Sequence, residues 1–243
     1  MDEYAVLVWS LREGPSSSVR RKQVTALKAA FALATKGKSR LLAENPLSDV
    51  PLPPAVARER HYLDWPQLDA LAEACGTYAG LIYVLGTSGP RIEEAARLDV
   101  KDLNRNKNTL FIRKSKTDAG KNRTTPIDPE YVAMLRTGIG PLFLSPDQQH
   151  RINTNNFRQR VFDPAVDKLF DFPLTPHDLR HTCASLAIAA GVDVLQVANM
   201  LGHADPSVTL RVYGHLFKAR GLDSVLAKMR QAHEQALVLV GNR

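Results

Sequence analysis

The stretch TPHDLRHTCASLAIAAG, residues 175–191, predicts one helix whose two ends are both marked in the sequence. Thr175 is a natural N-cap, Pro176 suits the first helical position, and Asp178 completes a capping-box pair with Thr175. Gly191 is typical of the position just past a helix end. An apolar stripe at helical spacing is expected to face the core: Leu179, Cys183, Leu186 and Ala190.

A second stripe, beside the apolar one, carries polar side chains at i, i+3, i+4 and i+7: His177, Arg180, His181 and Ala184. His177 and Arg180 point the same way from the first turn, where free N–H groups and the helix dipole attract anions. Two hydrogen-bond donors at a helix start are hard to explain as core packing. From this motif alone, anion binding and a purely structural role are equally supported.

The segments before this helix predict further helices and one hairpin. Residues 64–76 (DWPQLDALAEACG) form a helix capped by Asp64 and ended by Gly76, and residues 77–89 form a more buried helix. Residues 109–115 and 123–128 flank a polar turn as a β-hairpin, to which residues 99–108 add a possible third strand. Nearly everything from Pro129 onward is predicted helical. The fold class is therefore mainly α with a small antiparallel β-sheet, α+β.

The first sixty residues have a different composition. Residues 16–42 predict a helix with an apolar stripe, and Arg20, Arg21, Lys22 and Lys28 lie among its polar positions. Residues 44–60 contain four prolines and predict an extended linker. We place a domain boundary there, with residues 1–56 ahead of a larger domain at 57–243.

Composition restricts the class of protein. The formal net charge is +7 with a pI near 9.5, which favours an acidic partner, nucleic acid first, over an unremarkable basic surface. No apolar run is long enough to cross a membrane, and the N-terminus is not a signal peptide. Cys75 and Cys183 make no metal or disulfide pattern, which fits a reducing cytoplasm.

The motif TSGPRIEEAARL, residues 87–98, is the second candidate for anion binding. Gly89 breaks the preceding helix, Pro90 suits the start of a new one, and Arg91 is expected in its first turn. Glu94 lies on the same face and could hold Arg91 in position. Taken alone, the motif fits a surface Arg–Glu pair better.

The turn RKSKTDAGKNR, residues 113–123, carries Arg113, Lys114, Lys116 and Lys121. A basic turn of this kind can reach a DNA groove or backbone, although alone it fits an ordinary solvated turn.

The stretch DVLQVANMLGHADPSVTLRVYGHL, residues 193–216, predicts two short helices. Asp193 caps the first, Gly202 stops it, and His203 follows at once. Asp205 and Pro206 start the second, which is expected to end near Tyr213.

In chain order, the candidate residues resemble the catalytic set of the tyrosine recombinases, the phage integrase family. The matching pieces are TSGPRIEEAARL, SKT, HDLRHT, LGH and the tyrosine that ends SVTLRVY, spread over residues 59–216. Each piece is weakly specific, whereas all of them in order are highly specific. The resemblance assigns six catalytic residues: Arg91, Lys116, His177, Arg180, His203 and Tyr213. Lys114 and Lys121 lie close enough to compete with Lys116.

The resemblance implies DNA strand exchange through a 3′-phosphotyrosyl intermediate, with no metal and no cofactor. Tyr213 would be the nucleophile, His177 its base or proton relay, and Lys116 the acid that protonates the leaving 5′-oxygen. Arg91 and Arg180 would hold the phosphate oxygens, His203 would hydrogen-bond the phosphate, and Glu94 would support Arg91. The sequence lacks a carboxylate cluster of the kind that holds two metal ions, which favours this chemistry over metal-dependent hydrolysis.

The implied partners are double-stranded DNA attachment sites, three further copies of the chain in a tetramer on DNA, and an accessory DNA-bending or excision factor. Six basic side chains are expected to contact DNA: Arg20, Arg21, Lys22, Lys114, Lys121 and Arg123. Residues 1–56 are expected to be the last part of a helical core-binding domain. A phage or mobile-element integrase is the first interpretation; an Xer-type resolvase and a catalytically weak DNA-binding regulator are the alternatives.

Overall fold

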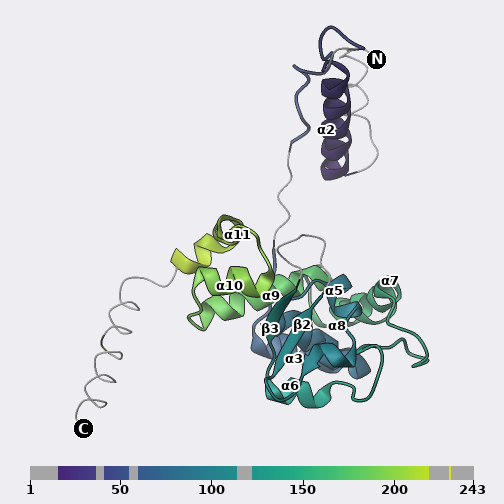
Figure 1. Cartoon of the computed structure of the whole chain (residues 1–243), viewed down its shortest axis with the longest axis vertical. Helices are drawn as coiled ribbons and strands as arrows, with labels where there is room; N and C mark the ends of the chain where they lie inside the picture. The colour runs from purple at the N-terminus through teal and green to yellow at the C-terminus, as the bar shows by residue number, and fades with distance from the viewer. Residues whose placement is uncertain (1–15, 37–40, 55–59, 114–121, 219–229, 231–243) are drawn as a thin grey trace. The chain divides into compact units, whose positions relative to one another are not determined.

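A computed structural model describes the chain except residues 1–15, 37–40, 55–59, 114–121, 219–229 and 231–243. The chain divides into two compact units, Met1–Glu59 and Arg60–Arg243, close to the boundary after residue 56 that the sequence predicts. Figure 1 shows the elements of each unit. None of the helices in the described ranges is both long and apolar enough to span a membrane.

In the described residues of the first unit, the main element is the helix α2 (Ser17–Ala34). The proline-rich segment after it was predicted to be an extended linker, and its first half instead packs on α2. Leu47 and Val50 are buried against apolar side chains of α2, because the helix would otherwise expose its apolar stripe to water. Polar contacts tie the same segment down: Arg21 Nη1 donates to the Pro53 carbonyl at 2.6 Å, and Lys28 Nζ to that of Ser48 at 3.0 Å.

The second unit confirms the α+β prediction (Figure 1). Its sheet has three antiparallel strands in the order β1-β2-β3, with Leu103 opposite Leu110 and Leu110 opposite Thr125. The strands are β1 (Leu103–Asn104), β2 (Thr109–Ile112) and β3 (Arg123–Pro126). The helices before and around the sheet are α3 (Trp65–Ala74), α4 (Ala79–Tyr83), α5 (Ile92–Ala96) and α6 (Pro129–Met134), with 3-10 turns η1 (Gly76–Tyr78) and η3 (Val100–Asp102).

The later helices run from α7 to α11. They are α7 (Thr154–Phe157), α8 (Asp163–Leu169), α9 (Pro176–Ala189), α10 (Val194–Leu201) and α11 (Pro206–Lys218), with the π-helical turn η5 (Arg158–Phe162) between α7 and α8. Another π-helical turn, η2 (Val84–Ser88), continues α4 and ends at Gly89, which has a left-handed φ of 70°.

Helix α9 is the central element of the second unit. It packs on η2 and also against α10 and α11. Leu179 and Cys183 of its predicted apolar stripe are buried, and so are Arg180 and Ala184 of the polar stripe, whereas Ala190 is exposed. Because neighbours cover α9 on more than one side, the apolar stripe alone does not define its buried surface.

Two regions differ from the helices that the sequence predicts. The first is the segment after α6, which is not helical, although nearly everything after Pro129 is predicted to be. The guanidinium of Arg105 donates to the carbonyls of Val132 and Leu135 at 2.8 and 2.9 Å, and Gly138 and Gly140 then take positive φ angles. Such angles are incompatible with a continuing helix.

Helix α11 does not end near Tyr213 but continues to Lys218. A glycine within a helix costs only about 1 kcal/mol relative to alanine, and the side chains of Tyr213, Leu216 and Phe217 pack in one apolar cluster with residues of α9 and α10. This packing maintains the helix through Gly214.

Candidate active site

The first turn of α9 holds two of the predicted residues. The capping box is present: Asp178 Oδ2 accepts from the Thr175 backbone N–H at 2.8 Å and from the Thr175 hydroxyl at 2.6 Å. Pro176 follows at the first helical position, as predicted. This rigid start fixes His177 and Arg180 on one side of the turn.

Arg180 is the buried centre of the site, with 3% of its surface exposed. Its Nη1 donates to the Gly89 carbonyl at 2.7 Å, and its Nη2 donates to the Leu201 carbonyl. The guanidinium thus connects α9 to the turn before Arg91 and to the end of α10 before His203. Burial, followed by repulsion from Arg91, lowers the pKa of Arg180 to about 10, so the side chain stays charged at neutral pH.

Arg91 belongs to a network centred on Glu94. The helix was predicted to include Arg91 in its first turn, and α5 instead begins at Ile92 with Arg91 as its extended N-cap. Glu94 Oε1 accepts from Arg91 Nη1 at 2.7 Å, and Oε2 accepts from the Arg91 backbone N–H at 2.9 Å. Oε2 also accepts from Arg123 Nη2 at 2.6 Å. A carboxylate that is 3% exposed therefore holds two guanidinium groups.

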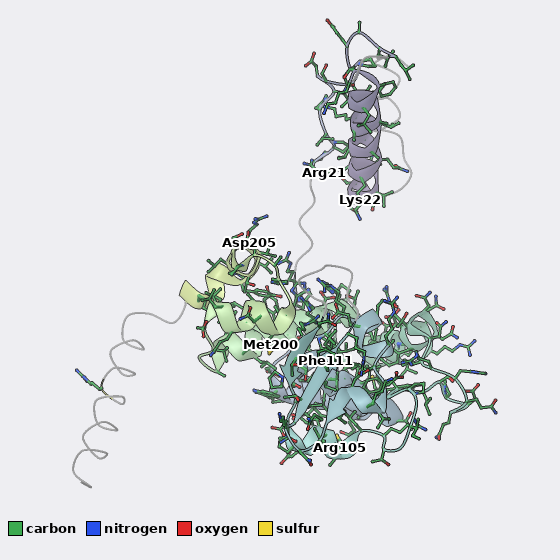
Figure 2. The ribbon with its side chains drawn as sticks, in the orientation of Figure 1. Arg21, Lys22, Arg105, Phe111, Met200 and Asp205 are labelled. Atoms are coloured by element: carbon green, nitrogen blue, oxygen red, sulfur yellow. The ribbon has the colours of Figure 1, made fainter. Side chains whose placement is uncertain are left out.

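The side chain of Arg123 is buried, whereas the sequence predicts that it contacts DNA. We expected a DNA-contacting side chain on the hairpin, but its side chain is 7% exposed and lies against Glu94. Its Nε also donates to the carbonyl of Met200 at 3.2 Å, a residue labelled in Figure 2. The inward face of β3 directs Arg123 toward α10, so it joins the support of the site rather than the basic surface.

His203 follows the left-handed Gly202 (φ 67°) that ends α10, as predicted. Its backbone N–H bonds to the Ala198 carbonyl at 2.9 Å, and its Nδ1 is hydrogen-bonded to the Thr209 hydroxyl at 2.8 Å. Burial first, and then the charges of Arg180 and Arg91, lower the pKa of His203 to about 4. The imidazole is therefore neutral at physiological pH.

Tyr213 lies on α11 with 1% of its surface exposed. Its hydroxyl is hydrogen-bonded to His181 Nδ1 at 2.6 Å. Burial raises the pKa of the phenol above its usual range, and the charge of Arg180 opposes that shift. His181 belongs to the polar stripe of α9, and the family resemblance assigns it no role.

These side chains act on one another electrostatically. Burial first, and then the charge of Arg180, lowers the pKa of His177. The charge of Arg180 also contributes to the lowered pKa of His203 and opposes the rise in that of Tyr213, while Arg91 and Arg180 repel each other. The guanidinium groups of Arg91 and Arg123 both pair with the carboxylate of Glu94, whose charge also acts on Arg180. The hydrogen bonds of Arg180 go to neutral carbonyls, so they do not cancel its charge. Such a concentration of positive charge, with Arg123 and Arg180 buried and Arg91 partly exposed, is suited to an anion.

The structure thus brings together five of the six predicted catalytic residues: Arg91, His177, Arg180, His203 and Tyr213. Lys116, Lys114 and Lys121 fall outside the described residues. Arg20, Arg21 and Lys22 lie on α2 of the first unit, where Figure 2 labels two of them.

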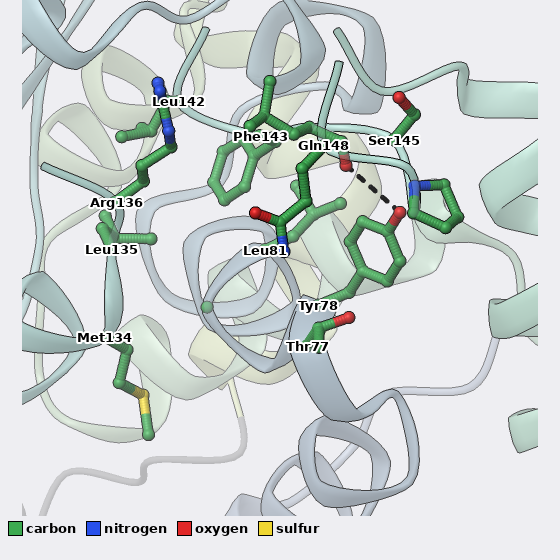
Figure 3. A pocket seen from close by; sticks show the side chains of 13 residues that line it. Thr77, Tyr78, Leu81, Met134, Leu135, Arg136, Leu142, Phe143, Ser145 and Gln148 are labelled. Atoms are coloured by element: carbon green, nitrogen blue, oxygen red, sulfur yellow. Dashed lines mark hydrogen bonds between the residues drawn. The ribbon is translucent and has the colours of Figure 1, made fainter. Parts of the chain in front are cut away.

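A separate pocket of about 280 Å³ lies between the start of α4 and residues 134–148 (Figure 3). The Tyr78 hydroxyl donates to the Leu144 carbonyl there at 3.1 Å. Of the catalytic candidates in the described part of the chain, none lines this pocket. Within that same part, no group of three or more His, Cys, Asp or Glu residues is placed to hold a metal ion.

Comparison with known proteins identifies the family of the chain. A model of the phage integrase family matches residues 62–220. The chain is 27% identical over 212 residues to tyrosine recombinase XerC of Pelobacter propionicus, covering 80% of this chain and 67% of that protein. It is 28% identical over 233 residues to XerD of Pseudomonas putida, covering 88% and 76%.

Solved structures share the fold. The Tn1549 transposon integrase in complex with a circular intermediate DNA has a TM-score of 0.73 at 22% identity, covering 95% of this chain and 85% of that one. The catalytic domain of bacteriophage HP1 integrase has a TM-score of 0.55 at 25% identity, covering 70% and 95%. The family match covers well over half of the sequence and includes every predicted catalytic residue, so the chain belongs to the phage integrase family, the tyrosine recombinases.

Proposed function

We propose that the protein is a site-specific recombinase, an integrase of a phage or mobile element, that cuts and rejoins DNA through a 3′-phosphotyrosyl intermediate. The observation that carries the proposal is that the charge of Arg180 acts on the hydroxyl of Tyr213, in a site where the guanidinium groups of Arg91 and Arg123 share the carboxylate of Glu94. A phosphodiester is the anion in DNA, and a phenol is a nucleophile that can form a covalent bond to it.

In the proposed step, the Tyr213 oxygen attacks phosphorus and the bond to the 5′-oxygen breaks. The phenol gives its proton to a neighbouring histidine, and the leaving 5′-oxygen gains one from Lys116. Arg91 and Arg180 stabilise the negative charge that grows on the non-bridging oxygens, and His203 donates a hydrogen bond to one of them. The arginines supply the positive charge, so the chemistry proposed here uses no metal.

In the intermediate, a phosphodiester bond to the Tyr213 oxygen replaces the phosphodiester bond to the 5′-oxygen of DNA. A free 5′-hydroxyl can therefore attack the phosphotyrosine and reverse the reaction without ATP. Each tyrosine cleaves one strand, and two duplexes have four strands, so we propose that four copies of the chain assemble on DNA. We also propose an accessory DNA-bending or excision factor as a further partner. Because the proposed substrate is chromosomal DNA, we expect the protein to act in the cytoplasm.

The role of an Xer-type resolvase is the second candidate, favoured by the relatives named XerC and XerD. The two roles share one reaction and differ in the DNA that is cut. Sequencing DNA that stays attached to the protein after denaturation in detergent distinguishes them. Sites at the ends of a mobile element support the integrase, and one chromosomal site supports the resolvase.

The reaction itself is tested by cleavage of a nicked duplex that carries the DNA site identified by that sequencing, called the recovered site below. The short 5′-hydroxyl fragment diffuses away, which traps the covalent complex as a slow band on a denaturing gel. We expect the band with wild type, no band with Tyr213→Phe, and a normal band with Tyr78→Phe, whose hydroxyl bonds to a carbonyl in the separate pocket. If wild type shifts DNA in a native gel but forms no adduct, the protein is a DNA-binding regulator and the proposal fails.

A further inference from the structure

The hydroxyl of Tyr213 is held by a histidine that the catalytic set assigned above does not include. His181 Nδ1 lies 2.6 Å from Tyr213 Oη, while the aromatic rings of the two residues are 5.7 Å apart. The two side chains come from different helices, α9 and α11, which pack against each other. The contact is therefore a tertiary one that depends on how α11 lies across α9.

The protonation of the pair follows from its surroundings. A buried phenol at neutral pH keeps its proton, so Tyr213 donates and His181 Nδ1 accepts, which places the imidazole proton on Nε2. Burial first, and then the neighbouring His177 and Arg60, lower the pKa of His181 to about 4, so the ring is neutral at physiological pH and can accept a proton. The charged and titratable groups around His181 are His177, Arg60, Asp178, Arg180, Tyr62 and Tyr213.

The direction of the hydrogen bond suits a nucleophile. The proton of Tyr213 points at Nδ1, so the oxygen lone pairs point elsewhere and can approach phosphorus as the proton leaves. With 1% of the residue exposed, a protein group rather than bulk water has to take that proton. His177 is near enough to assist, since its ring stands nearly perpendicular to that of His181 with centroids 5.1 Å apart.

We propose that His181 is the proton acceptor for Tyr213 in the cleavage step. This rests on the proposed function. The O–H proton moves to Nδ1 as the new O–P bond forms, the bond from phosphorus to the 5′-oxygen breaks, and that oxygen takes its proton from Lys116. In the reverse step, the imidazolium returns its proton to the phenolate oxygen.

A substrate with sulfur in place of the bridging 5′-oxygen isolates this half of the reaction. A thiolate leaves without a proton, so the rate of adduct formation no longer depends on Lys116. In a duplex carrying the recovered site, we expect His181→Phe and His181→Asn to form adduct about 100-fold or more slowly than wild type at pH 7. His215→Asn is the matched control: it lies on α11 two residues from Tyr213, stacks on Tyr62, and is expected to match wild type.

The pH profile separates proton transfer from mere positioning. Asparagine keeps a hydrogen-bond acceptor near the hydroxyl but cannot take the proton. The rate of His181→Asn is therefore expected to rise about tenfold per pH unit as free phenolate replaces the base, whereas the wild-type rate stays level from pH 6 to 9. A His181→Asn rate equal to wild type at pH 7, or a His181→Phe rate that is equal or higher, overturns the proposal. A higher rate would mean that His181 only holds the nucleophile back.

A measurement without DNA keeps this test apart from that of the proposed function. Nitrogen-15 NMR of the histidines should give His181 the Nε2–H form in wild type, and the signal of its Nδ1 should move in Tyr213→Phe. If His181 carries its proton on Nδ1, the proposal is overturned whatever the protein does to DNA. If wild type forms no adduct while His181 shows the expected form, the proposed function fails instead.

Discussion

Replacing Glu94 by glutamine tests the network that holds Arg91. Glu94 is 3% exposed and accepts hydrogen bonds from Arg91 Nη1, the Arg91 backbone N–H and Arg123 Nη2. Glutamine has the same shape, but it loses the charge, and its amide nitrogen would face a donor. Removing one partner of a buried ion pair costs about 3–5 kcal/mol. Since the Arg91 side chain is 25% exposed, we expect the lower end, about 3 kcal/mol, or a fall in Tm of about 6–12 °C.

Urea denaturation of the whole chain, followed by circular dichroism, measures this loss. Glu93→Gln is the matched control, since Glu93 is exposed and accepts a hydrogen bond only from the Thr154 hydroxyl among the contacts described; it should change stability by less than about 0.5 kcal/mol. The double variant Glu94→Gln/Arg123→Met removes both buried charges and should recover part of the loss. A Glu94→Gln protein as stable as Glu93→Gln would refute the reasoning.

Three other predictions concern the same core. Gly89→Ala should lose about 2–4 kcal/mol of stability in urea, because φ is +70° and the new Cβ would lie 2.8 Å from Leu201; an unchanged midpoint would contradict this. His181 and His203 have folded pKa values of about 4, below the ordinary 6.5, so the unfolded chain binds protons first. Stability should be full above pH 6.5 and fall as the pH drops toward 4, and urea titrations that are flat over that window would rule this out. Arg180→Lys keeps a charge but cannot bridge two carbonyls, so adduct formation should fall by about 100-fold in a protein with a native spectrum; a near-normal rate would oppose the assigned role.

Most of the fold could be predicted from short sequence motifs that mark the ends of helices. The capping box at Thr175, the cap at Asp193 and the left-handed glycines at 89 and 202 act within a few residues, so the sequence alone locates the helix ends. These ends are also where Arg91, His177 and His203 lie. That is why a site assembled from distant segments could be predicted at all.

Contacts across the chain could not be predicted in the same way. Arg123 sits in RTTP, a strand with no apolar residue to mark its inward face, and only the pairing with Glu94 reveals that it is buried. His181 meets Tyr213 because α11 extends past Gly214 and packs on α9, which no local pattern specifies. The proline-rich segment after α2 looks like a linker until Leu47 and Val50 are seen to cover that helix.

The most direct test of the account is the identity of the residue that joins the DNA. Adduct formed on the recovered duplex would be digested with nuclease and trypsin and analysed by mass spectrometry. Cleavage after Arg211 and Lys218 releases the peptide VYGHLFK, residues 212–218, in which Tyr213 is the single tyrosine. The account predicts a nucleotide on that tyrosine. A nucleotide on any other residue, or an adduct that persists in Tyr213→Phe, would contradict it.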